Sequence, residues 1–566
     1  MTRKALMSNA PALAEVVLRG GSVLPLDGTG QIHEAIAIRG DRILAVGSNA
    51  DIELTAGPGT QVIELDDLTL LPGFNDAHAH MEREGLKRLR ISLAGARSIS
   101  EITDRIVAAS RQIRPGEWII TMPVGDPPFF FGGPEVLTEK RMPNRYELDA
   151  AAPQHPVCIL GLFGNWGRPP GYTALNSLAL SLNGIDAGAR PRCSGVEIIK
   201  DADSGEPTGV IVEHNARPTV EFDLLPAVPR FGFEERLRGA KHSMQLYNAV
   251  GTTSVYEGHG SAPEIISAYR ALWERGEMSV RVALTVSPTW ADSSEAAVIM
   301  RDCLSYARGR GFGDPWLRIS GVHIAYGGDA VTAALARADL PNSGWSGFVE
   351  QANSKHDFHS YCMLAAEHDL RVHTIVGDQL HEVIPVIEQV AERYRLSDRR
   401  WVIEHIGRAR VQDLKKLKVL GLCATTIPVY HLWKGGDRYL EEPDGGNLVV
   451  PHRSMRDLGI PLACATDNIP YDPLFTLSTI CTRSERTSGR VIGAEQRLAV
   501  EDGIHLLTTA GAWLTFEEGC KGPLVPGNLA DLTVLSENPL HTEPEDLKNI
   551  RCQLTMVGGR IVFNEL

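Results

Sequence analysis

The sequence predicts an α/β fold: a (β/α)8 barrel of the TIM type, a small all-β domain built from both ends of the chain, and a long insertion after the first barrel strand. Two patterns support this prediction. Through the middle of the 566 residues, apolar strand-like runs of about five residues alternate with amphipathic helical stretches, as in parallel α/β folds. At both ends, short runs rich in β-branched residues follow one another with turns between them.

The terminal domain is predicted from residues 15–70 and 525–566. The first segment contains EVVLRGGSVLPL, AIAIRGDRILAVG and QVIELDDLTLL, separated by Gly, Asp or Asn turns, and the second contains LADLTVLS and CQLTMVGGRIVFNE. Some 450 residues of a different pattern separate the two segments. We therefore expect residues 1–70 and 520–566 to form one β-domain, and residues 71–519 to form the barrel.

The barrel strands are predicted from about eight apolar runs, the number that a (β/α)8 barrel requires. In chain order they are LLPGFNDAHAH, TTSVYE, VRVALTV, WLRISGVHIA, LRVHTIV, RWVIEHI, LCATTI and PLACATD. A capping box of Ser98 and Glu101 indicates a helix start. Residues 112–230 are too long for one βα unit and carry clusters such as GDPPFFFGGP, so we interpret them as an insertion over the barrel mouth.

Composition narrows the class of protein. Hydrophobic residues make up 43% and charged residues 22%, as in ordinary soluble proteins, and the net charge of -14 disfavours a nucleic-acid partner. The nine cysteines form no CxxC pair, which is typical of reduced thiols. The chain has no apolar run of about 18 residues and no apolar core of signal-peptide length near its start, so we expect a cytoplasmic protein without a membrane partner.

Metal-ligand residue types recur at the ends of the predicted strands. His78 and His80 end the first run and, on a strand, would project to the same face about 7 Å apart. His373, His405 and Asp467 lie at the ends of later runs, and the carboxyl ends of barrel strands meet at one face. Each residue alone is typical of a packed histidine or a helix cap. Together they favour a site for Zn, Fe or Mn with an open position for water.

Several motifs carry a resemblance to a known family. They are LLPGFNDAHAH, MPNRYELDAAAPQHPV, ALNSLAL, SGEPTGVIVE, VGTTSVYE, VHTIVGD, WVIEH, ATDNIPYDPL, PGNLADLTVLSENPL and MVGGRIVF. Over nearly the whole chain the sequence resembles the amidohydrolase superfamily, in particular its YtcJ-like branch, which includes N-substituted formamide deformylase. The resemblance implies a β-sandwich formed by both termini. It also implies metal ligands from strands one, five, six and eight, which fall on His78, His80, His373, His405 and Asp467.

One position departs from the family pattern. Many members carry a lysine at the end of strand four, often carboxylated to bridge two metals, whereas this chain has His323 in GVHIAYGGD. Imidazole cannot form that bridging carbamate. Three interpretations stay open: His323 ligates a metal itself; the site is mononuclear with His78, His80, His373 and Asp467 as ligands; or His323 packs or faces the substrate. Tyr172 likewise lies near the place where relatives have a histidine.

The resemblance and the residue set predict an enzyme that hydrolyses a non-peptide C–N bond with one or two divalent ions, zinc with iron or manganese as alternatives. The bond would be in an amide, an N-substituted formamide or a cyclic amide. Water activated by the metal attacks, and Asp467 takes a proton and later delivers it to the leaving nitrogen. His405 and His323 are the candidates that help to polarise the carbonyl group.

Substrate contacts are predicted mainly from aromatic residues, although core packing is the alternative for each. The candidates are Phe130, Trp166, Tyr172, His259 and Trp433. Two other function classes stay open: the same metal site used for heterocycle deamination or non-oxidative decarboxylation, and a structural relative without catalysis. We expect a small-molecule substrate and a homodimer or higher homo-oligomer.

Overall fold

A nearly closed barrel of eight parallel strands forms the centre of the computed structural model, which describes residues 13–163, 169–215, 219–345, 349, 351–442 and 444–566. The barrel strands are β6 (Phe74–Asp76), β12 (Thr252–Ser261), β13 (Arg281–Val286), β15 (Leu317–His323), β16 (Val372–Ile375), β17 (Val402–Glu404), β18 (Cys423–Thr426) and β19 (Leu462–Cys464). Each pairs in parallel with the next, and a short β14 (Phe312–Gly313) pairs antiparallel with β15. The predicted barrel is confirmed.

Hydrogen bonds beyond the strand ends join the first and last barrel strands. The backbone N–H of Thr466 donates to Asp76 Oδ1 over 3.0 Å, and the N–H of Asp467 donates to the carbonyl oxygen of His78 over 3.2 Å. Asn468 Oδ1 accepts from the N–H of His80 over 3.0 Å. These contacts hold the segment after β19 against the segment after β6, where the predicted site residues lie.

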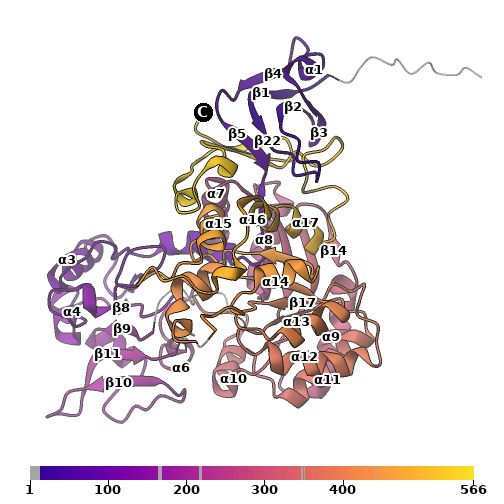
Figure 1. Cartoon of the computed structure of the whole chain (residues 1–566). Helices are drawn as coiled ribbons and strands as arrows, with labels where there is room; N and C mark the ends of the chain where they lie inside the picture. The colour runs from indigo at the N-terminus through magenta and orange to yellow at the C-terminus, as the bar shows by residue number, and fades with distance from the viewer. Residues whose placement is uncertain (1–12, 164–168, 216–218, 346–348, 350, 443) are drawn as a thin grey trace, which may run out of the picture.

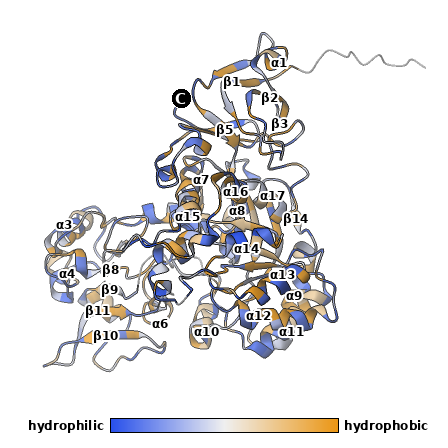
Figure 2. Cartoon of the chain, viewed as in Figure 1, coloured by the Kyte–Doolittle hydropathy of each residue, from blue (hydrophilic) through white to orange (hydrophobic). Residues whose placement is uncertain are grey.

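Helices cover the outside of the barrel (Figure 1). They include α7 (Phe233–Asn248), α8 (Pro263–Glu274), α9 (Ser293–Ala307), α10 (Ala330–Ala338), α11 (Lys355–Glu367), α12 (Leu380–Ala391), α13 (Val411–Val419), α14 (His452–Asp457), α15 (Pro473–Thr482), α16 (Val500–Leu507) and α17 (Thr509–Leu514). Val372 and Ile403 of the strands share a buried apolar cluster with Val383 and Ile387 of α12. Figure 2 shows hydrophobic and hydrophilic residues along α11 and α12, as expected for helices that cover a core with one face.

The two ends of the chain form one eight-stranded sheet. It contains β1 (Val16–Val23), β2 (His33–Arg39), β3 (Arg42–Gly47), β4 (Gln61–Glu64), β5 (Thr69–Pro72), β20 (Leu532–Leu535), β21 (Cys552–Val557) and β22 (Arg560–Asn564). β5 pairs antiparallel with β20, and Leu18 and Val534 share one core. This is the domain predicted from the two terminal segments, and it lies above the barrel in Figure 1.

A separate five-stranded sheet lies within the predicted insertion and beside the barrel (Figure 1). Its strands are β7 (Ile119–Thr121), β8 (Val157–Ile159), β9 (Gly171–Leu175), β10 (Val196–Lys200) and β11 (Pro207–Glu213), accompanied by α3 (Ile99–Ser110), α4 (Arg145–Ala151) and α5 (Ser177–Leu182). Ser98 caps α3 by accepting from the N–H of Glu101 over 3.2 Å. The Glu101 carboxylate, however, accepts from the N–H of Arg97 rather than completing the predicted box at Ser98.

None of the helices in the described part of the chain combines the length and the apolar character that a membrane span requires.

Candidate active site

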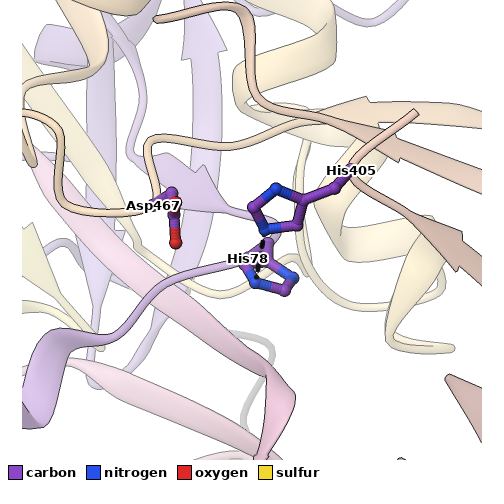
Figure 3. A group of neighbouring side chains, drawn as sticks. All are labelled: His78, His405 and Asp467. Atoms are coloured by element: carbon purple, nitrogen blue, oxygen red, sulfur yellow. Dashed lines mark hydrogen bonds between the residues drawn. The ribbon is translucent and has the colours of Figure 1, made fainter. Parts of the chain in front are cut away.

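Three of the predicted ligands, His78, His405 and Asp467, meet at the carboxyl ends of the barrel strands (Figure 3). Their ligand atoms all lie within 4.8 Å of one another, and all three residues are buried. They follow β6, β17 and β19, so residues more than 300 positions apart in the sequence converge only when the barrel closes. This group occupies the face at which barrel enzymes place their chemistry.

The backbone turns sharply where two of these residues leave their strands. His405 and Asp467 have φ angles of 55° and 53°, and Asn468 has 60°. A left-handed conformation is uncommon outside glycine and costs free energy, so the surrounding contacts must hold it. In both places the turn brings the side chain to the barrel mouth.

The spacing of the group fits a divalent metal. The Nε2 atoms of His78 and His405 are 3.1 Å apart. Two nitrogens bound to one zinc ion at about 2.0–2.1 Å and a tetrahedral angle would be about 3.3 Å apart. Two imidazoles and one carboxylate are also the donor types that Zn, Fe and Mn accept. The residues that could hold a metal are therefore His78, His405 and Asp467.

Glu404, which the sequence analysis did not identify, supports His78 from behind. Its Oε1 lies 3.5 Å from His78 Nδ1, and both side chains are fully buried. Gly258 makes this approach feasible, because a Cβ there would stand 2.5 Å from Glu404 Oε1 and 2.7 Å from His78 Nδ1. Burial alone would lower the pKa of His78, but Glu404, Asp467 and Asp76 together outweigh it and raise that pKa. A carboxylate at Nδ1 directs the Nε2 lone pair toward a metal.

His373 lies on the far side of Glu404 and differs from its predicted role as a ligand. Its Nδ1 is 3.1 Å from Glu404 Oε1, and its Nε2 contacts the hydroxyl group of Tyr256. His373 is the second residue of β16, so its ring lies deeper in the barrel than that of His405, which follows β17. Burial lowers the pKa of His373 to about 4. Burial alone would raise the pKa of Glu404, but the charges and hydrogen bonds of His78 and His373 lower it to about 2. His373 thus holds the carboxylate, and among the described residues it belongs to no group of metal-ligand atoms.

His80 also differs from its predicted role, because an arginine fixes its protonation. Nη2 of the buried Arg83 lies 3.0 Å from His80 Nδ1. A guanidinium group can only donate, so Nδ1 must accept and the ring proton must be on Nε2. That Nε2 is 3.1 Å from Asp467 Oδ1. Burial, followed by the Arg83 charge, holds the pKa of His80 well below its usual value. In this arrangement the protonated Nε2 of His80 lies beside the Asp467 carboxylate and has no free lone pair for a metal.

The arginine belongs to α2 (Met81–Glu84), in a buried network of charges. Arg83 Nε donates to Glu82 Oε1 over 2.9 Å, and Tyr269 donates to Glu257 Oε1 over 2.8 Å. His80, Glu82 and Glu257 form a second group whose ligand atoms lie within 4.8 Å. In this second group, Arg83 already supplies the positive charge that a metal ion would bring. Burial, followed by the charge of Glu82, raises the pKa of Glu257 well above its usual value.

A cavity of about 310 Å³ opens beside the ligand group and is lined by two of its residues, His405 and Asp467. Predicted site residues that line it are His80, His259, His323, His405 and Asp467, and it is also lined by Tyr326, Gln351, Asp378, Gln379, Tyr430, His431 and Arg438. His323 ends β15, and its ring centre is 4.8 Å from that of His259. His323 therefore faces the cavity but is outside the group of three ligands.

The aromatic residues predicted to contact substrate lie elsewhere. Phe130 and Tyr172 line a different cavity, of about 250 Å³, which includes Arg486. The centre of the Trp433 ring lies 4.9 Å from that of Phe129, so Trp433 packs between the insertion and the barrel. Trp166 is outside the described residues. The cavity over the ligand group is polar instead of apolar as predicted, because histidines and charged side chains follow most of its strands.

The residues that the sequence analysis missed had visible signals. Glu404 directly precedes a predicted ligand in WVIEH, and Arg83 lies three positions after His80. His431 and Arg438 belong to HLWKGGDRY, the loop after the seventh strand. Proximity in the sequence marks such residues as candidates, whereas their direction in space depends on the turns that follow each strand.

Comparisons with known proteins agree with this geometry. The family model described as "Amidohydrolase family" matches residues 61–563. The chain belongs to this family. This amidohydrolase is 24% identical to N-substituted formamide deformylase of Arthrobacter pascens, covering 97% of the chain and 98% of that protein. It is also 24% identical to putative amidohydrolase YtcJ of Bacillus subtilis (strain 168), covering 97% and 100%, and to protein LONG AFTER FAR-RED 3 of Arabidopsis thaliana, covering 99% and 94%.

A solved structure confirms the fold of this amidohydrolase. An uncharacterised metal-dependent hydrolase from Pyrococcus furiosus aligns with a TM-score of 0.66 and 18% identity, covering 93% of this chain and 99% of that chain. The family match therefore makes the chain a hydrolase that acts on carbon–nitrogen bonds.

Proposed function

We propose that this amidohydrolase hydrolyses a small non-peptide amide, an N-substituted formamide or a cyclic amide, with a zinc ion held by His78, His405 and Asp467. The observation that carries the proposal is the convergence of these three side chains beneath a cavity at the barrel mouth. The similarity to N-substituted formamide deformylase over almost the whole chain supports the bond type. Atrazine chlorohydrolase TrzN from Arthrobacter aurescens TC1, solved in complex with zinc, shares the fold with a TM-score of 0.50 and 13% identity, and it supports the choice of metal.

The protein residues around the group divide the work of hydrolysis. The chemistry that a divalent ion supplies when bound is acidification of water and polarisation of a carbonyl group. The Asp467 carboxylate is the base at this place, and it returns the proton to the leaving nitrogen. His80 Nε2 lies 3.1 Å from Asp467 Oδ1, and this buried contact limits the orientations of the carboxylate. Glu404 Oε1 lies 3.5 Å from Nδ1 of His78 and attracts that ring from the other side.

The experiment is a metal analysis combined with a substrate screen. Purified protein is analysed by mass spectrometry for zinc, iron and manganese, and then assayed for amine release from N-substituted formamides, simple amides and lactams. Aminated heterocycles are included, and ammonia release from them would replace the proposal with deamination. His78→Ala is the matched control, because it removes one ligand from the group. Full activity in metal-free protein, or in the control, would contradict the proposal.

A further inference from the structure

The cavity over the ligand group has a second set of polar lining residues, next to those assigned to hydrolysis. This set consists of His431 in η3 (Val429–Lys434), Arg438 in η4 (Gly436–Tyr439), and the start of α12 with Gly377 and Gln379 before it. The ring of His431 is 6.0 Å from that of His405, so the set adjoins the ligand group. None of its residues has a role in the hydrolysis described above.

His431 lines this cavity and carries a donor whose position on the ring is fixed. Arg438 Nη2 lies 3.0 Å from His431 Nδ1, and because the guanidinium group only donates, the ring proton must be on Nε2. That Nε2 is buried and makes no hydrogen bond with any described residue, although the side chain is only 2% exposed. Leaving a buried donor unpaired costs free energy, so such an atom calls for a partner. An acceptor on a ligand in the cavity would supply it.

Arg438 contributes the charge. It is the one lysine or arginine among the described residues that line the cavity, and its side chain is 45% exposed. Stacking on the Tyr439 ring, at 4.6 Å, and the contact with His431 hold the guanidinium group in place. Asp378 is 4.0 Å away, at the outer limit of an ion pair. Its Oδ1 already accepts from the Arg408 N–H and the Tyr439 hydroxyl group, each over 2.8 Å.

The start of α12 adds to the positive electrostatic potential that Arg438 creates in the cavity. Gly377 and Gln379 line the cavity immediately before this 12-residue helix, so its amino-terminal end opens there. The N–H groups and the dipole at a helix start favour negative charge. Gly377 has a φ of 50° and open space where a Cβ would be, which leaves room for a ligand atom. An N–H donor, a guanidinium group and a helix start thus all select for an oxyanion.

We propose that Arg438, His431 and the start of α12 form a subsite for a carboxylate group of the substrate, so that the amide hydrolysed at the ligand group carries a carboxylate, as an N-acyl amino acid does. The proposal rests on the proposed amide hydrolysis and names its substrate class. A carboxylate matches the planar fork of an arginine, which can bind it through two parallel hydrogen bonds. The proposed subsite therefore differs from the substrate contacts that the sequence predicted from aromatic residues.

The test compares acid and carboxamide forms of the same compounds. N-formyl and N-acetyl amino acids and their carboxamides are titrated into the metal-loaded protein by calorimetry, and amine release is measured in parallel. We expect the acids to bind at least about 10-fold more tightly than the carboxamides, because charged hydrogen bonds are stronger than neutral ones. In Arg438→Met the ratio of the two affinities should fall to near one, and in Arg438→Lys it should be intermediate.

A matched control and the opposite outcomes make the test decisive. Arg486→Met changes an arginine in the separate cavity of the insertion, and it should keep the full preference for acids. Equal binding of the two forms, binding of neither, or a preference that survives Arg438→Met would overturn the subsite. The last result would mean that the carboxylate binds elsewhere, for example at the metal. Acids that bind with the expected preference but are never hydrolysed would leave the subsite standing and contradict the proposed function. Equal hydrolysis of the acids and the carboxamides would leave the proposed function standing and contradict the subsite.

Discussion

His78 and His80 belong to one motif, but the Nδ1 atoms of their rings face partners of opposite charge. On one side, His78 faces the carboxylate of Glu404 with its Nδ1, 3.5 Å away. On the other side, His80 faces the guanidinium group of Arg83 with its Nδ1, 3.0 Å away. An acceptor behind the ring leaves Nε2 free to bind a metal, whereas a donor behind the ring puts the proton on Nε2. The partner behind each ring therefore decides its chemistry, although the motif presents the two residues as equivalent.

The largest expected effect comes from changing Asp467, whose carboxylate lies near both His78 and His80. Asp467→Asn keeps the size and an acceptor for His80 but removes the base, so turnover should fall at least about 100-fold. Thermal unfolding followed by circular dichroism should show an intact fold, and the metal content should be measured on the same sample. Turnover equal to that of the unmodified protein would remove Asp467 from catalysis.

The next effect tests the carboxylate side. Glu404→Gln should weaken metal affinity by about 10- to 100-fold, because the ring of His78 loses the partner that orients it. Competition with a chelator gives the affinity. Glu517→Gln is the control, since Glu517 is also buried but pairs with Lys521 at 2.6 Å, away from the histidines. An affinity that is unchanged in Glu404→Gln, or equally reduced in the control, would show that the carboxylate does not support the site.

The smallest effect tests the arginine side. Arg83→Lys keeps a positive charge beside Glu82 but cannot hold both of its present partners, so His80 loses one hydrogen bond worth about 1 kcal/mol. We expect a decrease in turnover of about fivefold at constant metal content. The nitrogen chemical shifts of His80 should show loss of the single Nε2–H form. Arg90→Lys, at a partly buried pair with Glu235, provides the control. Loss of metal from Arg83→Lys alone would contradict the assigned role.

The sequence predicted the barrel and the convergence of His78, His405 and Asp467. Apolar strand-like runs alternate with helical stretches, and these three residues lie at the ends of such runs. The sequence could not predict that His373 lies deeper than His405, since that depends on where each short strand ends relative to its histidine. It also predicted Phe130, Tyr172 and Trp433 as substrate contacts, with core packing as the alternative. Their hydrophobicity indicates burial but not the partner against which they pack.

The most direct test of this account is the metal content of His78→Ala and His80→Ala, prepared side by side and dialysed against metal-free buffer. The account predicts that His78→Ala loses its metal, whereas His80→Ala keeps the stoichiometry of the unmodified protein and loses turnover, because Asp467 is no longer held. X-ray absorption of the bound metal should then show the same number of imidazole ligands in His80→Ala as in the unmodified protein. Equal loss of metal from both variants, or one imidazole fewer in His80→Ala, would show that both histidines bind the metal and would contradict the account.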